Sequence, residues 1–180
     1  MSNKTLLLNE GQISEMLEKM ADEIINKCPD KNNIALIGIR TRGTVMSQRL
    51  KEILSNKLNI DVPLGVLDIT LYRDDLSTLA SQPIVGITDI LFDINGKIIV
   101  LVDDVLYTGR TIRAALDAIV DFGRPKSILL TVLIDRGLRE YPIQADIIGL
   151  KVETDVNQSV QVRLNEVDGD NNVFLISLDK

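Results

Sequence analysis

Residues 98–111 read Ile-Ile-Val-Leu-Val-Asp-Asp-Val-Leu-Tyr-Thr-Gly-Arg-Thr and carry most of the information about the fold. An apolar run typical of a strand ends in two adjacent carboxylates, Asp103 and Asp104. A short loop with one glycine follows, and an amphipathic stretch of helical type begins near Arg110. Free backbone N–H groups at the loop and the helix start can receive a phosphate. The carboxylates can accept hydrogen bonds from sugar hydroxyls or hold a water-rich Mg²⁺, so the stretch predicts a site for a phosphorylated sugar.

Strand and helix patterns alternate on both sides of this stretch. Helical spacing of apolar residues predicts helices over residues 10–27, 43–57 and 110–122. Apolar runs predict strands over residues 34–39, 62–71, 98–103, 127–134, 145–152, 160–164 and 173–178. The alternation indicates an α/β fold, with a mostly parallel sheet and helices on both of its faces. Ligands bind such sheets beyond the carboxyl ends of the strands, where the two carboxylates are expected.

Composition narrows the kind of protein and its chemistry. The chain has 180 residues, which fits one domain, and its 45% hydrophobic but 3% aromatic content predicts an aliphatic core. A net charge of −6 argues against a generally basic nucleic-acid surface. Histidine is absent, so a bound metal should have oxygen ligands, and the single cysteine, Cys28, excludes a disulfide framework. No signal peptide and no membrane-spanning apolar run is evident, so we expect a cytoplasmic protein without membrane contact.

The stretch at 98–111 resembles the phosphoribosyl-pyrophosphate (PRPP) binding signature of the type I phosphoribosyltransferases. Its Val-Asp-Asp-Val-Leu-Tyr-Thr-Gly-Arg-Thr form is similar to the PyrR subfamily, whose members combine uracil phosphoribosyltransferase activity with RNA-dependent control of pyrimidine operons. A lone aspartate here would more simply end a strand. The resemblance covers about residues 5–178 and implies the type I phosphoribosyltransferase fold as a single domain over residues 1–180. It places the core at about 30–135, and a small hood in 136–180 plus the N-terminal segment.

The resemblance assigns PRPP to two strand-to-helix junctions. The PRPP and 5′-phosphate residues would be Asp103, Asp104, Tyr107, Thr108, Gly109, Arg110 and Thr111. The two aspartates would be catalytic and would hold the cofactor Mg²⁺ directly or through water. The pyrophosphate residues would be Arg40, Thr41, Arg42 and Gly43. The residues themselves support this second assignment, because amides at a strand end and two arginines can bind an anion. An ordinary surface turn is the alternative.

Two further segments carry expected roles. In the family, the sequence around Tyr72, Arg73, Asp74 and Asp75 begins a lid that closes over PRPP, and Arg73 would be a catalytic group on the leaving pyrophosphate. A solvated acidic loop is the alternative. Arg136, Ile147 and Ile148 would contact the base, although a plain strand pair also fits. This chain departs from the family pattern at Leu138, Tyr141 and Ile147, which leaves the base open.

The resemblance implies conversion of uracil and PRPP to UMP and pyrophosphate by a homo-oligomer. The alternatives are a regulator that binds RNA and senses UMP or PRPP, and a phosphoribosyltransferase for another nucleobase. Tyr107 replaces a carboxylate usual in 6-oxopurine enzymes, which favours uracil. The outer face of the first helix carries Glu15, Glu18, Asp22 and Glu23, and carboxylates repel a phosphate backbone, so we expect RNA binding to be weak or lost. An oligomer could still assemble a basic surface from Arg139, Lys151 and Arg163.

Overall fold

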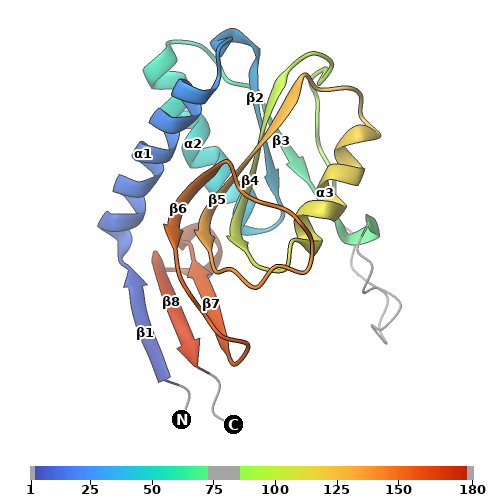
Figure 1. The fold of residues 1–180 in the computed structure, drawn as a ribbon. Helices are drawn as coiled ribbons and strands as arrows, with labels where there is room; N and C mark the ends of the chain where they lie inside the picture. Colours follow the sequence, from blue (N-terminus) through green and yellow to red (C-terminus); the bar gives the residue numbers. More distant parts are fainter. Residues whose placement is uncertain (1–2, 73–85, 178–180) are drawn as a thin grey trace.

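A large parallel sheet forms the centre of the molecule. The structure, a computed structural model, describes residues 3–72 and 86–177. Its five strands are β3 (Leu64–Leu67), β2 (Ile34–Ile39), β4 (Ile98–Leu106), β5 (Ser127–Asp135) and β6 (Ile147–Lys151), in that spatial order. Every neighbouring pair is parallel, so all carboxyl ends lie at one edge of the sheet (Figure 1). The α/β prediction with a mostly parallel sheet is confirmed.

Helices cover both faces of this sheet. Helices α1 (Glu10–Lys27) and α2 (Arg42–Leu58) lie on one face, and α3 (Arg110–Val120) lies on the other (Figure 1). Successive side chains of β4 point to opposite faces, so Val100 belongs to the core cluster beneath α1 and α2 and Ile99 to the cluster beneath α3. Burial on both faces explains why β2 and β4 read as continuous aliphatic runs.

A second, antiparallel sheet lies beyond the carboxyl ends of the large one. It consists of β1 (Asn3–Leu8), β8 (Asn172–Ser177) and β7 (Gln158–Arg163), with β8 in the middle. A four-residue helix, α4 (Asn165–Asp168), joins β7 to β8. The sequence patterns did not predict β1 or α4, because β1 is largely exposed and α4 is too short to show a period. We call this small sheet with α4 the hood.

The structure corrects three boundaries next to the predicted site. β3 ends at Leu67 rather than at residue 71. The carboxylate of Asp68 accepts a hydrogen bond from the N–H of Thr70 and so forms a turn, which leads into a 3-10 helix, η2 (Thr70–Tyr72). β4 runs on to Leu106, since Val105 and Leu106 still pair with β5, so the two carboxylates lie inside the strand. β6 belongs to the large sheet, which therefore extends past residue 135, the expected core boundary.

The core of the described residues is aliphatic, as expected.

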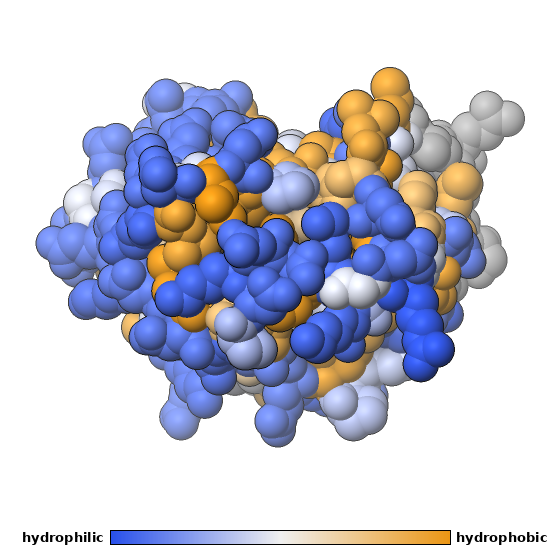
Figure 2. Space-filling view, turned by 90° about the horizontal axis from the view of Figure 1, so that it is seen from above, coloured by the Kyte–Doolittle hydropathy of each residue, from blue (hydrophilic) through white to orange (hydrophobic). Residues whose placement is uncertain are grey.

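The last described element is a short 3-10 helix, η1 (Lys31–Asn33), which leads into β2. Seen from the end away from the hood, polar side chains cover most of the surface with apolar side chains between them (Figure 2). Among the helices in the described part of the chain, none has the length and apolar character needed to cross a membrane.

Candidate functional site

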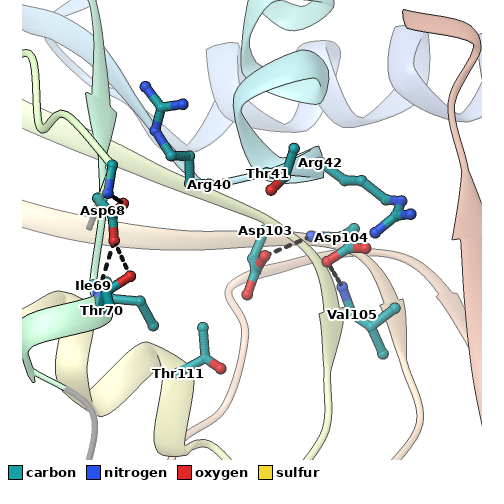
Figure 3. A pocket seen from close by; sticks show the side chains of 11 residues that line it. Arg40, Thr41, Arg42, Asp68, Ile69, Thr70, Asp103, Asp104, Val105 and Thr111 are labelled. Atoms are coloured by element: carbon teal, nitrogen blue, oxygen red, sulfur yellow. Dashed lines mark hydrogen bonds between the residues drawn. The ribbon is translucent and has the colours of Figure 1, made fainter. Parts of the chain in front are cut away.

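A cavity of about 500 Å³ opens at the carboxyl edge of the large sheet. It gathers residues from the ends of β2, β3 and β4 and from the start of α3 (Figure 3). The lining residues are Arg40, Thr41, Arg42, Asp68, Ile69, Thr70, Gly86, Asp103, Asp104, Val105 and Thr111. The structure therefore brings the acidic pair and the arginine-rich turn, which are far apart in sequence, into one polar cavity.

Gly43 allows the close approach of these two segments. A Cβ atom at this position would lie 2.5 Å from the carbonyl oxygen of Val102 and 3.2 Å from the Cα of Asp103. Without a side chain, the first turn of α2 rests directly on β4, and the turn at Arg40 and Thr41, whose shared peptide bond is cis, reaches the carboxylates. Gly43 is thus a structural requirement of the site, while its neighbours Arg40, Thr41 and Arg42 line the cavity.

Asp103 and Asp104 differ in their surroundings although they are adjacent. Asp103 is 6% exposed, and its Oδ1 accepts a hydrogen bond from the backbone N–H of Asp104 at 3.0 Å. Burial, reinforced by the neighbouring charge of Asp104, raises the pKa of Asp103 well above its ordinary value. Asp104 is half-buried, and its Oδ1 accepts the N–H of Val105 at 3.0 Å. Crowded carboxylates of this kind favour a cation or a hydroxyl donor beside them.

The cationic side of the cavity is held by neighbouring acceptors. Arg42 donates from Nε and Nη2 to the carboxylate of Asp168, at 3.0 and 2.7 Å. Arg40 donates from Nη2 to the carbonyl of Ile87 at 3.2 Å. Both arginines therefore keep N–H donors for an anion, because a guanidinium carries five.

Asp68 forms a wall of the cavity that the sequence analysis did not assign to the site. Its carboxylate accepts hydrogen bonds from the N–H of Thr70 at 2.8 Å and of Gly86 at 2.5 Å. Burial raises the pKa of Asp68, but these bonds, the Thr70 hydroxyl and the charge of Arg40 outweigh it and leave the pKa below its ordinary value. Asp68 thus remains a carboxylate that orders the segments on either side of it.

The predicted phosphate loop contributes to the cavity through its last residue. Thr111 lines the cavity, while Arg110 pairs with Glu140 at 2.6 Å on the exposed side. Gly109 has φ +91°, in the left-handed region that favours glycine, and it precedes the first turn of α3 without a side-chain cap. The N–H of Arg110 donates to Thr108 Oγ1 at 3.3 Å, while Gly109 offers no side chain to the amides that follow it, which suits a phosphate.

The segment after β5 supports the back of this loop. The carbonyl of Thr108 accepts the N–H groups of Glu140 and Tyr141, at 2.9 and 3.0 Å. Arg139 donates to the carbonyl of Tyr107 at 2.9 Å and to that of Ile143 at 2.8 Å, and it pairs with Asp135 at 2.7 Å. Tyr107 and Thr108 are therefore held in place by their backbones. From its sequence Arg139 was expected only as a surface cation, because nothing near it in sequence indicates these contacts.

The three residues expected at the base have different surroundings. Ile147 is 1% exposed and packs in the core cluster beneath α1 and α2. Arg136 is also buried and donates to Thr154 Oγ1 and to the carbonyls of Asp155 and Gln158, with its guanidinium 4.0 Å from the ring centre of Tyr107. Both side chains are thus largely buried, and their expected place beside the base stays a prediction.

Arg136 also lines a surface cavity, together with Leu138 and Thr154, and Ile148 lines a second, smaller one. This second cavity has a volume of about 260 Å³ and lies beyond the carboxyl ends of β5 and β6. Its lining residues are Asp135, Gly137, Arg139, Gln144, Ala145, Ile148 and Lys151. Asp135 and Lys151 are register partners in the parallel pair of β5 and β6, a signal in the sequence that could have placed them together.

The expected lid falls largely outside the part of the chain that the structure describes. Arg73, Asp74 and Asp75 belong to residues 73–85, which are outside it. Tyr72 is described, and its hydroxyl donates to Asp121 at 2.5 Å.

The ligands that this site offers suit a metal ion that arrives bound to the substrate. Among residues 3–72 and 86–177, no cluster of three or more acidic, cysteine or histidine side chains could hold a metal alone. Two adjacent carboxylates in a polar cavity do suit Mg²⁺, which keeps several waters and takes other ligands from phosphates.

Comparison with known proteins identifies the family. Residues 5–167 match the phosphoribosyl transferase domain family. The chain is 51% identical over 173 residues to the bifunctional protein PyrR of Pelotomaculum thermopropionicum, covering 96% of both chains. The chain belongs to the PyrR branch of the phosphoribosyl transferase family. It is also 48% identical to the bifunctional protein PyrR of Listeria monocytogenes serotype 4b, covering 98% of both chains.

Solved structures show the same fold for this PyrR chain. A hypoxanthine-guanine phosphoribosyltransferase from Bacillus anthracis has a TM-score of 0.72 at 20% identity, covering 97% of this chain and 98% of its own. The hypoxanthine phosphoribosyltransferase of Trypanosoma cruzi has a TM-score of 0.71 at 20% identity, covering 99% and 96%. The expected family and the type I phosphoribosyltransferase fold are therefore confirmed, and the chain is a phosphoribosyltransferase.

Proposed function

We propose that this PyrR-family chain converts uracil and PRPP to UMP and pyrophosphate. The observation that carries the proposal is the polar cavity in which Asp103 and Asp104, the turn at Arg40–Arg42 and Thr111 meet. These groups match the three parts of PRPP: a ribose with two hydroxyls, a pyrophosphate and a 5′-phosphate. Membership in the PyrR branch supports the assignment.

PRPP would lie across the carboxyl ends of β2 and β4. The 5′-phosphate would accept N–H groups at residues 107–111, where the N-cap residue of α3, Gly109, has no side chain to occupy them. The ribose hydroxyls would donate to Asp103 and Asp104. The pyrophosphate would take the free N–H donors of Arg40 and Arg42 together with backbone groups of Thr41 and Gly43. Parallel neighbouring strands supply this spacing, because β2 and β4 end side by side.

Transfer would form a bond from uracil nitrogen to C1 of the ribose as the bond from C1 to the pyrophosphate oxygen breaks. The pyrophosphate keeps the bonding electrons, and the nitrogen loses its proton to solvent. Positive charge that develops on the ribose would be stabilised by Asp103 and Asp104, and the growing charge of the leaving group by Arg73, while Arg42 would offset the charge of the pyrophosphate equally throughout. Mg²⁺, when bound beside the aspartates, would offset the negative charge of PRPP and pyrophosphate.

Uracil would enter the second cavity beside Ile148. Asp135, Gln144 and Lys151 line this cavity and offer both donors and acceptors for the edge of a pyrimidine. Arg136, which lines the adjoining cavity, and Ile147, next to Ile148 in β6, stay predicted neighbours of the base. Tyr107, which brings no carboxylate, favours uracil over a 6-oxopurine.

Pyrophosphate release with each nucleobase in turn tests this function. The purified chain should release pyrophosphate from Mg²⁺ and PRPP with uracil, and it should form UMP in equal amount. Release with hypoxanthine or guanine but not with uracil would show that the base has been assigned wrongly. Activity that is equal with and without added Mg²⁺, after treatment with a chelator, would exclude the metal. The expected homo-oligomer can be checked in the same preparation by sedimentation.

RNA-dependent control is the second candidate function, because the relatives are named bifunctional. The charged surface supports our expectation that RNA binding is weak. Glu15, Glu18, Asp22 and Glu23 are exposed on α1, although Lys57 pairs with Glu18 and Asp22 and offsets part of their charge. Arg139 and Arg163, the arginines of the possible basic surface, are engaged with Asp135 and Asp170.

A further inference from the structure

Two ion pairs tie α2 to the hood, and one of them reaches the candidate site. Arg42, in the first turn of α2, donates to both oxygens of Asp168. Arg49, about two turns further along the same helix, donates in the same way to both oxygens of Glu166, at 2.9 and 2.6 Å. Arg42 lines the cavity with Asp103 and Asp104, whereas Arg49 does not. Of these two similar ion pairs, only the one made by Arg42 therefore lies at the candidate site.

Asp168 is a fixed acceptor. Its Oδ2 accepts the N–H of Leu164 at 2.9 Å, its own N–H donates to the carbonyl of Leu164 at 2.7 Å, and its carbonyl accepts from Arg163 at 2.8 Å. The side chain is 11% exposed. The hydrogen bond from Arg42 keeps the pKa of Asp168 below its ordinary value, so the group stays a carboxylate at neutral pH.

The pairing leaves Arg42 ordered but not saturated. Asp168 occupies Nε and one N–H of Nη2, which are two of the five donors of a planar guanidinium. Figure 3 shows the Arg42 side chain beside Asp104 at the cavity. An unrestrained arginine has many rotamers, and part of this rotamer entropy is lost when it binds an anion. An arginine already held by a carboxylate binds its anion with less of that loss.

We propose that Asp168 is a positioning residue for pyrophosphate recognition, which holds Arg42 so that its remaining N–H donors meet the pyrophosphate of PRPP. The inference rests on the proposed function, because it takes Arg42 as a pyrophosphate ligand. Asp168 touches neither substrate nor product and acts through Arg42. The contact is made before, during and after transfer, so losing it weakens PRPP binding and leaves turnover nearly unchanged.

The test compares Asp168→Asn with Glu166→Gln. Each variant replaces one carboxylate of the 165–171 turn by its amide and weakens one ion pair to α2, so the second is a matched control. PRPP is varied at saturating uracil, and inorganic pyrophosphate is titrated calorimetrically in a separate experiment. We expect Asp168→Asn to raise the KM for PRPP and the Kd for pyrophosphate about tenfold, within the range of couplings between contacting residues. Its kcat should stay within about twofold, and Glu166→Gln should match the parent.

Other outcomes overturn the inference. Tighter pyrophosphate binding by Asp168→Asn would show that the carboxylate competes with the anion for Arg42. Equal effects of both substitutions would reduce Asp168 to a structural tie. In an Arg42→Gln background, Asp168→Asn should add nothing, and a full further loss would disprove action through Arg42. A parent that forms no UMP would refute the proposed function, while the pyrophosphate titration would still decide the role of Asp168. A parent that binds no pyrophosphate would refute the inference itself.

Discussion

Asp103 accepts the backbone N–H of Asp104 at 3.0 Å while its own side chain is 6% exposed, so one carboxylate of the pair is nearly removed from water. Burial, and next the charge of Asp104, raises its pKa. The folded state therefore binds a proton more tightly than the unfolded state. Stability falls as the pH rises from the unfolded pKa through the folded one, and the loss persists at neutral pH.

Asp103→Asn should accordingly stabilise the fold while it abolishes transfer. The amide keeps an acceptor for the N–H of Asp104 but carries no charge. We expect a gain on the order of 1 kcal/mol in the free energy of unfolding at pH 7, which shrinks as the pH falls from the folded pKa of Asp103 towards its unfolded pKa and vanishes below the latter. Urea unfolding across this pH range checks it. A variant less stable than the parent at pH 7 would contradict the burial argument.

Arg139→Gln should loosen the phosphate loop. Arg139 binds Asp135 and the carbonyls of Tyr107, Gly137 and Ile143, so its removal takes one donor from each of these acceptors. We expect a loss of about 1–3 kcal/mol in the free energy of unfolding, together with a higher KM for PRPP. Arg113→Gln is the control, because its exposed pair with Asp117 is worth about 0.5 kcal/mol or less. Similar losses in both variants would exclude a special role for Arg139.

RNA binding should be weak and insensitive to sequence. Carboxylates on α1 repel a phosphate backbone, and the inward contacts of Arg139 leave it few donors for one. A filter-binding titration against a pyrimidine-operon leader RNA, with UMP present and at two salt concentrations, measures this. A scrambled RNA of equal length serves as control. Submicromolar, salt-sensitive binding of the leader alone would show that the surface has been misjudged.

Cys28 should not react in the native protein. The side chain is buried, and burial raises the pKa of its thiol to about 11, so the reactive thiolate is scarce at pH 8. We expect an aromatic disulfide reagent to label the chain only as it unfolds, and labelling should be complete in denaturant. Rapid stoichiometric labelling of the folded chain would contradict the burial of Cys28 at the C-terminal end of α1.

The centre of the site could be predicted from sequence because its parts follow neighbouring parallel strands. Arg40 follows β2 and Asp103 lies near the end of β4, and the pairing of these strands brings both residues to one edge. Gly43 in the first motif supports the same prediction, because only glycine permits the close contact between the start of α2 and β4. The motifs and the periodicity therefore predicted the same edge of the sheet, because neighbouring parallel strands end there.

The rest depended on contacts that a one-dimensional pattern does not contain. Alternation places Ile147 and Ile148 on opposite faces, but the position of α1 decides which face is buried. Arg136 is drawn to the carbonyls of Asp155 and Gln158, in a turn without a period. Asp168 reaches Arg42 across most of the chain, and nothing near either residue in sequence indicates the pairing.

The pairing of β1 with β8 joins the first described strand of the chain to the last. During synthesis the large sheet can assemble early, because its strands follow one another closely in sequence. The hood can form only after β8 has been synthesised, because β8 is the middle strand of its sheet. The pairing of β1 with β8 also closes a long loop, which is slow. Arg42 would then acquire its carboxylate partner last. A nascent chain should accordingly form the acidic pair of the cavity before Asp168 can hold Arg42. We therefore expect full affinity for pyrophosphate only after the hood has folded.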